Sequence, residues 1–177
     1  MNTITLETKA IGFPAIWLDT DIQSAEKMSA IELRKRGYTL SVFAQIHEIV
    51  AQQPDQPEYW SEYGLQTSVQ LAQHMTESDW ACLRNSWMSA SVIWQYRVAN
   101  LASYCASDRA IPLLADMLRM SSDDVYVRVL ESLGEFEPNE VMRHLSASDV
   151  NLMKQMSSSL AGLNKSAIDS VIRQLGV

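Results

Sequence analysis

The feature that most constrains the fold is a stripe of apolar residues spaced three and four positions apart, which recurs in successive segments from residue 39 onward. Leu40, Phe43, Ile46 and Val50 show the pattern, since these steps place them on one side of a helix. Prolines, glycines and cap-forming residues separate the segments. Because each such helix must bury its stripe against a neighbour, the sequence predicts an all-α fold.

The helical segments can be delimited from these stripes and their flanking residues. The segment over residues 91–106 is apolar on nearly all sides and predicts an inner helix. Pro112 is expected in the first turn of its helix, where its missing N–H costs nothing. We expect helices over residues 24–37, 39–53, 58–74, 76–87, 91–106, 111–118, 123–136, 138–145, 150–163 and 164–176.

The N-terminal residues differ from the rest of the chain. Residues 3–7 alternate like a short strand, and Gly12 and Pro14 interrupt the segment after it. We expect residues 1–22 to form a short irregular arm that precedes N-terminal helices over residues 23–75.

An internal repeat lies in the middle of the chain. Residues 90–106 can be laid over residues 121–137, and in the preceding helices Leu83 then falls on Leu114. Self-similarity at a period of about 31 residues is typical of stacked helical hairpins. This predicts an α-solenoid in a single domain over residues 1–177, with the clearest repeats over residues 76–137 and C-terminal capping helices over residues 138–177.

The second repeat resembles the short bacterial HEAT-like repeats. The resemblance rests on Ala-Ile-Pro-Leu-Leu at residues 110–114, Ser-Asp-Asp at 122–124, Val-Arg at 127–128 and Leu-Gly at 133–134. It implies that the acid-rich turn joins two helices, and that Asp123 and Arg128, with Arg97 in the earlier repeat, make structural bonds within or between repeats. Ser91 replaces a turn acid in the earlier repeat, so the number of repeats stays open.

Charge and targeting signals narrow the function. The chain has 177 residues, with 14 Lys and Arg against 21 Asp and Glu, and a net charge of -7. This balance disfavours nucleic acid and anionic membranes as partners and favours a basic protein. The N-terminus lacks a secretory layout and no apolar stretch approaches the length of a membrane span, so we expect a cytoplasmic protein.

Catalytic and metal-binding motifs are incomplete. His47 and Glu48 begin the pattern H-E-x-x-H, but Ala51 stands in place of the second histidine. Cys82 and Cys105 do not form a C-x-x-C pair and are expected to be reduced, packed thiols. We therefore expect no metal, no cofactor and no enzymatic activity.

The remaining feature is a cluster of acidic residues. On the helix over residues 123–136, Asp124, Glu131 and Glu135 occur at steps of seven and four, so they share one side. This side is either an ordinary solvated face or a surface that steers a basic protein. The acids between residues 116 and 140, which only Arg119 and Arg128 oppose, are Asp116, Asp123, Asp124, Glu131, Glu135, Glu137 and Glu140.

The first functional hypothesis is a non-catalytic protein-binding module. Small acidic bacterial proteins of this build resemble immunity proteins, and the resemblance implies one-to-one occlusion of a basic toxin or effector. The acidic side and the aligned helix of the earlier repeat supply the expected partner-binding residues Gln95, Tyr96, Asp124, Tyr126, Glu131 and Glu135.

Two alternatives remain open. Tryptophans near Arg97 suggest a likeness to the HEAT-like alkylpurine DNA glycosylases, although the spacing of Trp80, Trp87 and Trp94 is more typical of core residues. The acidic charge and the short chain argue against that enzyme. A scaffold or assembly factor is the other alternative, and the oligomeric state is undetermined.

Overall fold

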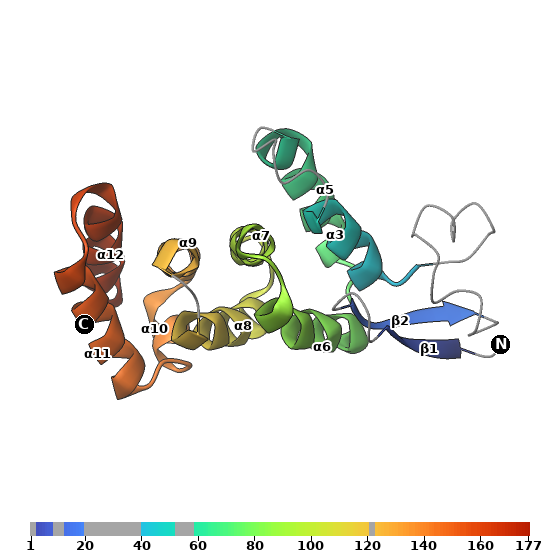
Figure 1. Cartoon of the computed structure of the whole chain (residues 1–177). Coiled ribbons are helices and arrows are strands. Elements are labelled where there is room, and N and C mark those ends of the chain that lie inside the picture. Colours follow the sequence, from blue (N-terminus) through green and yellow to red (C-terminus); the bar gives the residue numbers. More distant parts are fainter. Residues whose placement is uncertain (1–2, 9–12, 20–39, 52–58, 121–122) are drawn as a thin grey trace. The chain divides into compact units, whose positions relative to one another are not determined.

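The structure is a computed structural model that describes residues 3–8, 13–19, 40–51, 59–120 and 123–177 (Figure 1). Side chains are described from residue 40 onward within these ranges, except at residues 123 and 124. The chain forms two compact units, Met1–Trp94 and Gln95–Val177. The helix predicted over residues 24–37 lies outside the described residues.

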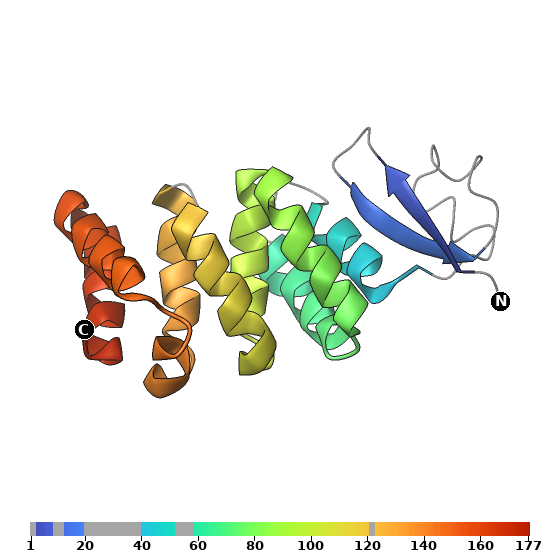
Figure 2. The same cartoon turned by 90° about the horizontal axis from the view of Figure 1, so that it is seen from below.

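The first unit begins with two antiparallel strands, β1 (Thr3–Thr8) and β2 (Phe13–Asp19). Ile4 pairs with Leu18, and the register is interrupted between Leu6 and Thr8. The two strands lie side by side (Figure 2). The strand predicted over residues 3–7 is thus confirmed, but the arm is a paired ribbon in this region and not an irregular segment. Sequence reasoning missed the second strand because Pro14 was read as an interruption, whereas β2 accommodates it near its start.

Helices make up the rest of the first unit. They are α3 (Val42–Ala51), a π-helical turn η1 (Trp60–Gly64) that continues into α5 (Leu65–Ala72), α6 (Glu77–Ser86), the 3-10 turn η2 (Trp87–Ser89) and the first residues of α7 (Val92–Ala102). Helix α3 packs against α5 and α6. The four tryptophans in these helices are buried, which confirms the prediction that Trp80, Trp87 and Trp94 are core residues.

The start of α6 is fixed by a capping box. The Thr76 hydroxyl accepts a hydrogen bond from the Asp79 N–H, and Asp79 Oδ2 accepts from the Thr76 N–H at 2.9 Å. The other carboxylate oxygen of Asp79 accepts from the N–H of Phe43 at 2.9 Å. One buried carboxylate therefore starts α6 and holds the first turn of α3.

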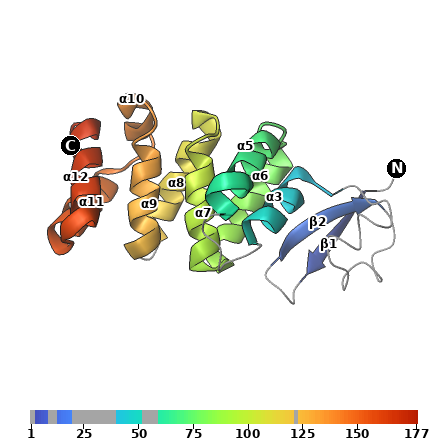
Figure 3. The same cartoon turned by 90° about the horizontal axis from the view of Figure 1, so that it is seen from above.

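The second unit contains the end of α7 and five further helices. They are α8 (Ser107–Met120), α9 (Asp123–Leu133), α10 (Pro138–Met142), α11 (Ala147–Ser159) and α12 (Gly162–Leu175). Helix α9 packs against α8 and α12, and α12 also packs against α10 and α11 (Figure 3). In α8 and α9 the apolar residues at steps of three and four are buried: Ile111, Leu114, Ala115, Leu118, Val125, Val129 and Leu133. Leu163, the last residue of the helix predicted over residues 150–163, is 88% exposed and belongs to α12.

Helix α7 differs from the prediction of an inner helix. Trp94, Val98 and Leu101 are buried, but Val92 and Ile93 are 47% and 43% exposed. Apolar residues all round a helix predict burial on all sides only when neighbours cover every side. Here the stripe at three- and four-residue steps is covered and the opposite side is open.

The starts of α8 and α12 also differ from prediction. Helix α8 begins at Ser107, so Pro112 is its sixth residue, and the carbonyl of Asp108 lacks the N–H that another residue at 112 would offer. Helix α12 begins at Gly162 with Ala161 as its N-cap, so Asn164 lies within the first turn. Its predicted end is confirmed, because Gly176 adopts a left-handed conformation with φ of 72°.

The prediction of a helical fold is confirmed for the described residues from 40 onward. Among these helices, none combines the length and the apolar character needed to cross a membrane.

Candidate functional site

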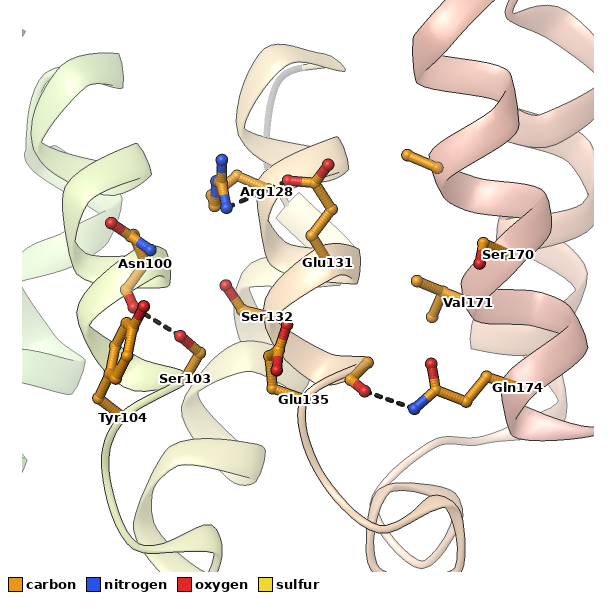
Figure 4. A pocket seen from close by; sticks show the side chains of 12 residues that line it. Asn100, Ser103, Tyr104, Arg128, Glu131, Ser132, Glu135, Ser170, Val171 and Gln174 are labelled. Atoms are coloured by element: carbon orange, nitrogen blue, oxygen red, sulfur yellow. Dashed lines mark hydrogen bonds and ion pairs between the residues drawn. The ribbon is translucent and has the colours of Figure 1, made fainter. Parts of the chain in front are cut away.

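The exposed side of α9 forms the floor of a groove in the second unit, with a volume of about 510 Å³ (Figure 4). Arg128, Glu131 and Ser132 lie on this side because steps of three and four residues return to the same side of a helix. The helix predicted to reach residue 136 ends at Leu133, so Glu135 lines the groove from the turn after α9. One wall comes from the end of α7 and the turn after it, and the other wall comes from α12.

An arginine is held at one end of the groove. The Nη2 of Arg128 donates to the hydroxyl of Tyr96 at 2.7 Å, and the guanidinium carbon lies 4.9 Å from the centroid of the Tyr96 ring. The Nη1 of Arg128 pairs with Glu131 at 3.2 Å. Stacking and the ion pair together fix the guanidinium between α7 and α9.

Glu135 gives the groove its unbalanced charge. Its side chain is exposed, and it makes no ion pair with any residue that the structure describes. The lining holds two carboxylates, Glu131 and Glu135, and one guanidinium, Arg128. Because Arg128 is paired with Glu131, the net charge of -1 resides at Glu135.

The α12 wall approaches α9 closely at Gly134. The side-chain amide of Gln174 donates to the carbonyl of Gly134. A β-carbon at Gly134 would lie 3.2 Å from Val171 Cγ2 and 3.2 Å from the carbonyl oxygen of Glu131. The glycine therefore allows the end of α9 and the helix α12 to meet and close one side of the groove.

The structure brings together part of the expected partner-binding set. Glu131 and Glu135 line the groove, Tyr96 contacts its arginine, and Gln95 is half-buried on α7. Tyr126 is not presented on this surface, because its side chain is 2% exposed and turned into the core. Burial, followed by the charge of Asp149, raises the pKa of the Tyr126 hydroxyl.

The remaining residues that the sequence singled out do not all lie in the groove. The side chains of Asp123 and Asp124 lie outside the described residues. Arg97 is only 4% exposed, and burial lowers the pKa of its guanidinium. Arg128 contacts Tyr96, which lies 32 residues earlier in the chain.

The two arginines opposing the acidic cluster are both paired inside the second unit. Arg119 binds Asp116 at 3.0 Å and Asp149 at 2.9 Å. Arg128 is held by Glu131. Glu135 and Glu137 are exposed, and neither makes an ion pair with a residue that the structure describes.

Sequence reasoning missed the groove walls. Tyr104 was assigned to an inner helix, yet its side chain is 59% exposed and lines the groove. Ser132 and Gln174 carried no motif that marked them. One signal was present: Tyr104 precedes Glu135 by 31 residues, which is the repeat period.

The incomplete catalytic motifs do not form a site. His47 lies between the rings of Phe43 and Trp94, with ring centroids 5.7 and 5.5 Å away, and burial lowers its pKa to about 4. Cys82 and Cys105 are free thiols, and burial raises the pKa of Cys105 to about 11. Within the described ranges, no group of three or more His, Cys, Asp and Glu residues is placed to hold a metal ion.

The Tyr96 hydroxyl is a testable part of the groove. Tyr96→Phe keeps the ring beneath Arg128 but removes the acceptor at 2.7 Å. We expect the free energy of unfolding of the second unit to fall by about 1 kcal/mol, as for one hydrogen bond to a charged group near the surface. Urea unfolding followed by circular dichroism measures this, and Tyr104→Phe is the control. Equal losses in the two variants would show that the hydroxyl of Tyr96 has no special role.

Comparison of the chain with protein-family models, with curated proteins and with solved structures finds no match in any of the three. The function of the groove is therefore inferred from its geometry.

Proposed function

We propose that the chain is a non-catalytic, cytoplasmic protein-binding module whose helical hairpins stack as a HEAT-like α-solenoid. We further propose that it acts as an immunity-type inhibitor that occludes a basic toxin or effector in a one-to-one complex. The observation that carries the proposal is the groove over α9, where Glu135 is an exposed carboxylate that pairs with no described cation and Tyr104 is an exposed ring.

The groove has features that would favour both fast association with a basic partner and slow dissociation from it. Exposed carboxylates raise the rate of encounter with a basic protein, because opposite charges attract over about a Debye length. An aromatic side chain covered on docking slows dissociation, since large rings contribute most to interface energies. Occlusion needs no reacting group in the inhibitor.

The alternatives receive less support. The features that suggested a DNA glycosylase were Arg97 and nearby tryptophans, and these side chains are buried in the core. Arg128, the one cation of the groove lining, is paired with Glu131 and so is not free for a phosphate. A scaffold or assembly factor would use the same groove, and the fate of the partner's activity separates it from an inhibitor.

Charge reversal in the groove tests the proposal. Glu131→Lys combined with Glu135→Lys is expected to weaken the affinity for the basic partner at least about tenfold and to flatten its salt dependence. The partner is first identified by co-purification from the native host, and its dissociation constant is then measured by calorimetry at several salt concentrations. A stoichiometry of one and loss of the partner's activity are the expected signs of inhibition.

A matched control separates the groove from the overall charge. Glu62→Lys combined with Glu137→Lys makes the same change, since each substitution adds two charge units and both double variants move the net charge from -7 to -3. Glu62 and Glu137 are exposed and do not line the groove. Affinity that is unchanged in the groove variant, or equally weakened in both variants, would contradict the proposed site.

Binding to duplex DNA at low salt separates the protein-binding module from the glycosylase alternative. We expect no binding, because an acidic groove repels phosphates. A DNA complex that is lost on replacing groove residues would favour the enzyme instead.

A further inference from the structure

We infer that the groove receives an arginine side chain of the partner protein, bound between Tyr104 and Glu135. The inference rests on the proposed function, because it names the group that the partner places in the same groove. One arginine is already held there: Arg128 lies 4.9 Å from the ring centroid of Tyr96, donates to the Tyr96 hydroxyl, and pairs with Glu131.

Beside this occupied arrangement lies a second one without its arginine. Ser132 comes four residues after Arg128 on the last turn of α9, and Glu135 comes four residues after Glu131 in the turn that follows the helix. Tyr104, in the turn after α7 and eight residues after Tyr96, lines the wall of the same groove with an exposed ring. The groove thus holds a second carboxylate and a second exposed ring, and a serine stands one step of four residues after the arginine.

The groups of this second arrangement are available to a ligand. Tyr104 is 59% exposed, and Glu135 makes no ion pair with a described residue. Ser132 lines the groove and is only 2% exposed, yet its hydroxyl has no hydrogen-bond partner among the residues that the structure describes. A buried hydroxyl without a partner is unfavourable, so a ligand that supplies a donor gains from binding here.

The chemistry of these groups selects a guanidinium. Its plane stacks on a tyrosine ring, and its N–H groups can bind a carboxylate through two parallel hydrogen bonds while another reaches a hydroxyl. Gln174 can add an acceptor, because its amide nitrogen is directed at the carbonyl of Gly134 and its side-chain oxygen still has lone pairs to offer. A lysine ammonium offers one compact charge and no plane, so it matches the arrangement less well.

The source of this arginine is a basic polypeptide. The groove lining has a net charge of -1, which one guanidinium neutralises. The groove lies on the surface across three helices, so a side chain on a protein loop can enter it from outside (Figure 4). Free arginine would lack the flanking contacts with Ser103 and Ser170 on the two walls.

The test uses the whole chain and short peptides as probes. Acetylated and amidated Gly-Arg-Gly-Arg-Gly is titrated into the labelled protein and followed by two-dimensional NMR, alongside the same peptide with lysine or with uncharged citrulline. We expect shifts confined to the groove, with the arginine peptide binding about fivefold more tightly than the lysine peptide. Glu135→Gln should weaken the arginine peptide about tenfold, and Tyr104→Leu should reduce the preference for arginine over lysine.

Glu137→Gln is the matched control, because it removes one exposed carboxylate that does not line the groove. Equal binding of the arginine and lysine peptides, shifts spread over the acidic surface, or no binding at about 10 mM peptide would overturn the inference, since a dissociation constant above about 10 mM is too weak for a site. A native basic partner that binds the Glu135→Gln variant with full affinity would overturn the inference but not the proposed function. Arginine-selective peptide binding in a chain that has no basic partner would overturn the proposed function alone.

Discussion

Lowering the pH from 6.5 to about 4 is expected to reduce the free energy of unfolding of the first unit by about 3 kcal/mol through His47. Burial between Phe43 and Trp94 lowers the pKa of His47 from 6.5 to about 4 in the folded protein. The unfolded chain takes up a proton near pH 6.5, whereas the folded chain does not until about pH 4. The stability is therefore complete above pH 6.5 and falls as the pH decreases toward 4.

Tryptophan fluorescence measures this effect in the first unit alone, because all five tryptophans lie within residues 1–94. Urea unfolding is recorded at intervals between pH 7 and pH 4. His47→Leu keeps an apolar side chain of similar volume between the rings and is expected to flatten the pH dependence over this range. His74→Leu is the control, since His74 is exposed and its replacement should leave the slope intact. A steep slope in the His47→Leu variant would show that another group titrates there.

Much of the helical fold could be predicted because helix starts and stripes are local. Thr76 and Asp79 are three residues apart, and this spacing alone predicts the capping box that begins α6. The stripe of Ile111, Leu114 and Leu118 depends only on steps of three and four residues. Such features are decided by residues within one or two helical turns of each other.

Features that depend on distant neighbours could not be predicted. Tyr126 lies between two buried valines, and the packing around it places the side chain in the core. Val92 is exposed because the described neighbours cover only the other side of α7. The π-helical turn at Trp60–Gly64 also depends on packing, since a β-carbon at Gly64 would lie 2.9 Å from the Trp60 ring.

In the candidate site, too, only the residues related by local helical spacing could be predicted. The sequence predicts Glu131 and Glu135 on one side of a helix because four residues make about one helical turn, and both line the groove although Glu135 lies just beyond the end of α9. Tyr104 and Gln174 belong to segments about 30 to 40 residues from these acids in sequence, and only packing brings them together. Their residue types carry no signal that fixes which helices meet.

Replacement of Asp149 is expected to have the second large effect on the free energy of unfolding. Its side chain is 5% exposed and accepts from the Ser146 N–H at 2.7 Å, which caps α11. It also accepts from Arg119 Nε at 3.0 Å and Nη2 at 2.9 Å, which joins α8 to α11. Asp149→Ala removes the cap and a bidentate pair together, so we expect the free energy of unfolding of the second unit to fall by about 3 kcal/mol.

Asp116→Ala is the control for this variant, because Asp116 binds the same arginine at 3.0 Å but its side chain is 56% exposed. We expect it to cost less than about 0.5 kcal/mol, as for exposed ion pairs. Circular dichroism follows the loss of helix in the whole chain, and tryptophan fluorescence follows the first unit separately, since all five tryptophans lie within residues 1–94. The pH dependence gives an independent check, because the hydrogen bond from Arg119 outweighs burial and lowers the pKa of Asp149 from 3.8 to about 2. Its contribution is therefore complete above pH 3.8 and is lost as the pH falls toward 2, below the range in which His47 acts. Equal losses in the Asp116→Ala and Asp149→Ala variants would mean that the buried position of Asp149 adds nothing to the pair.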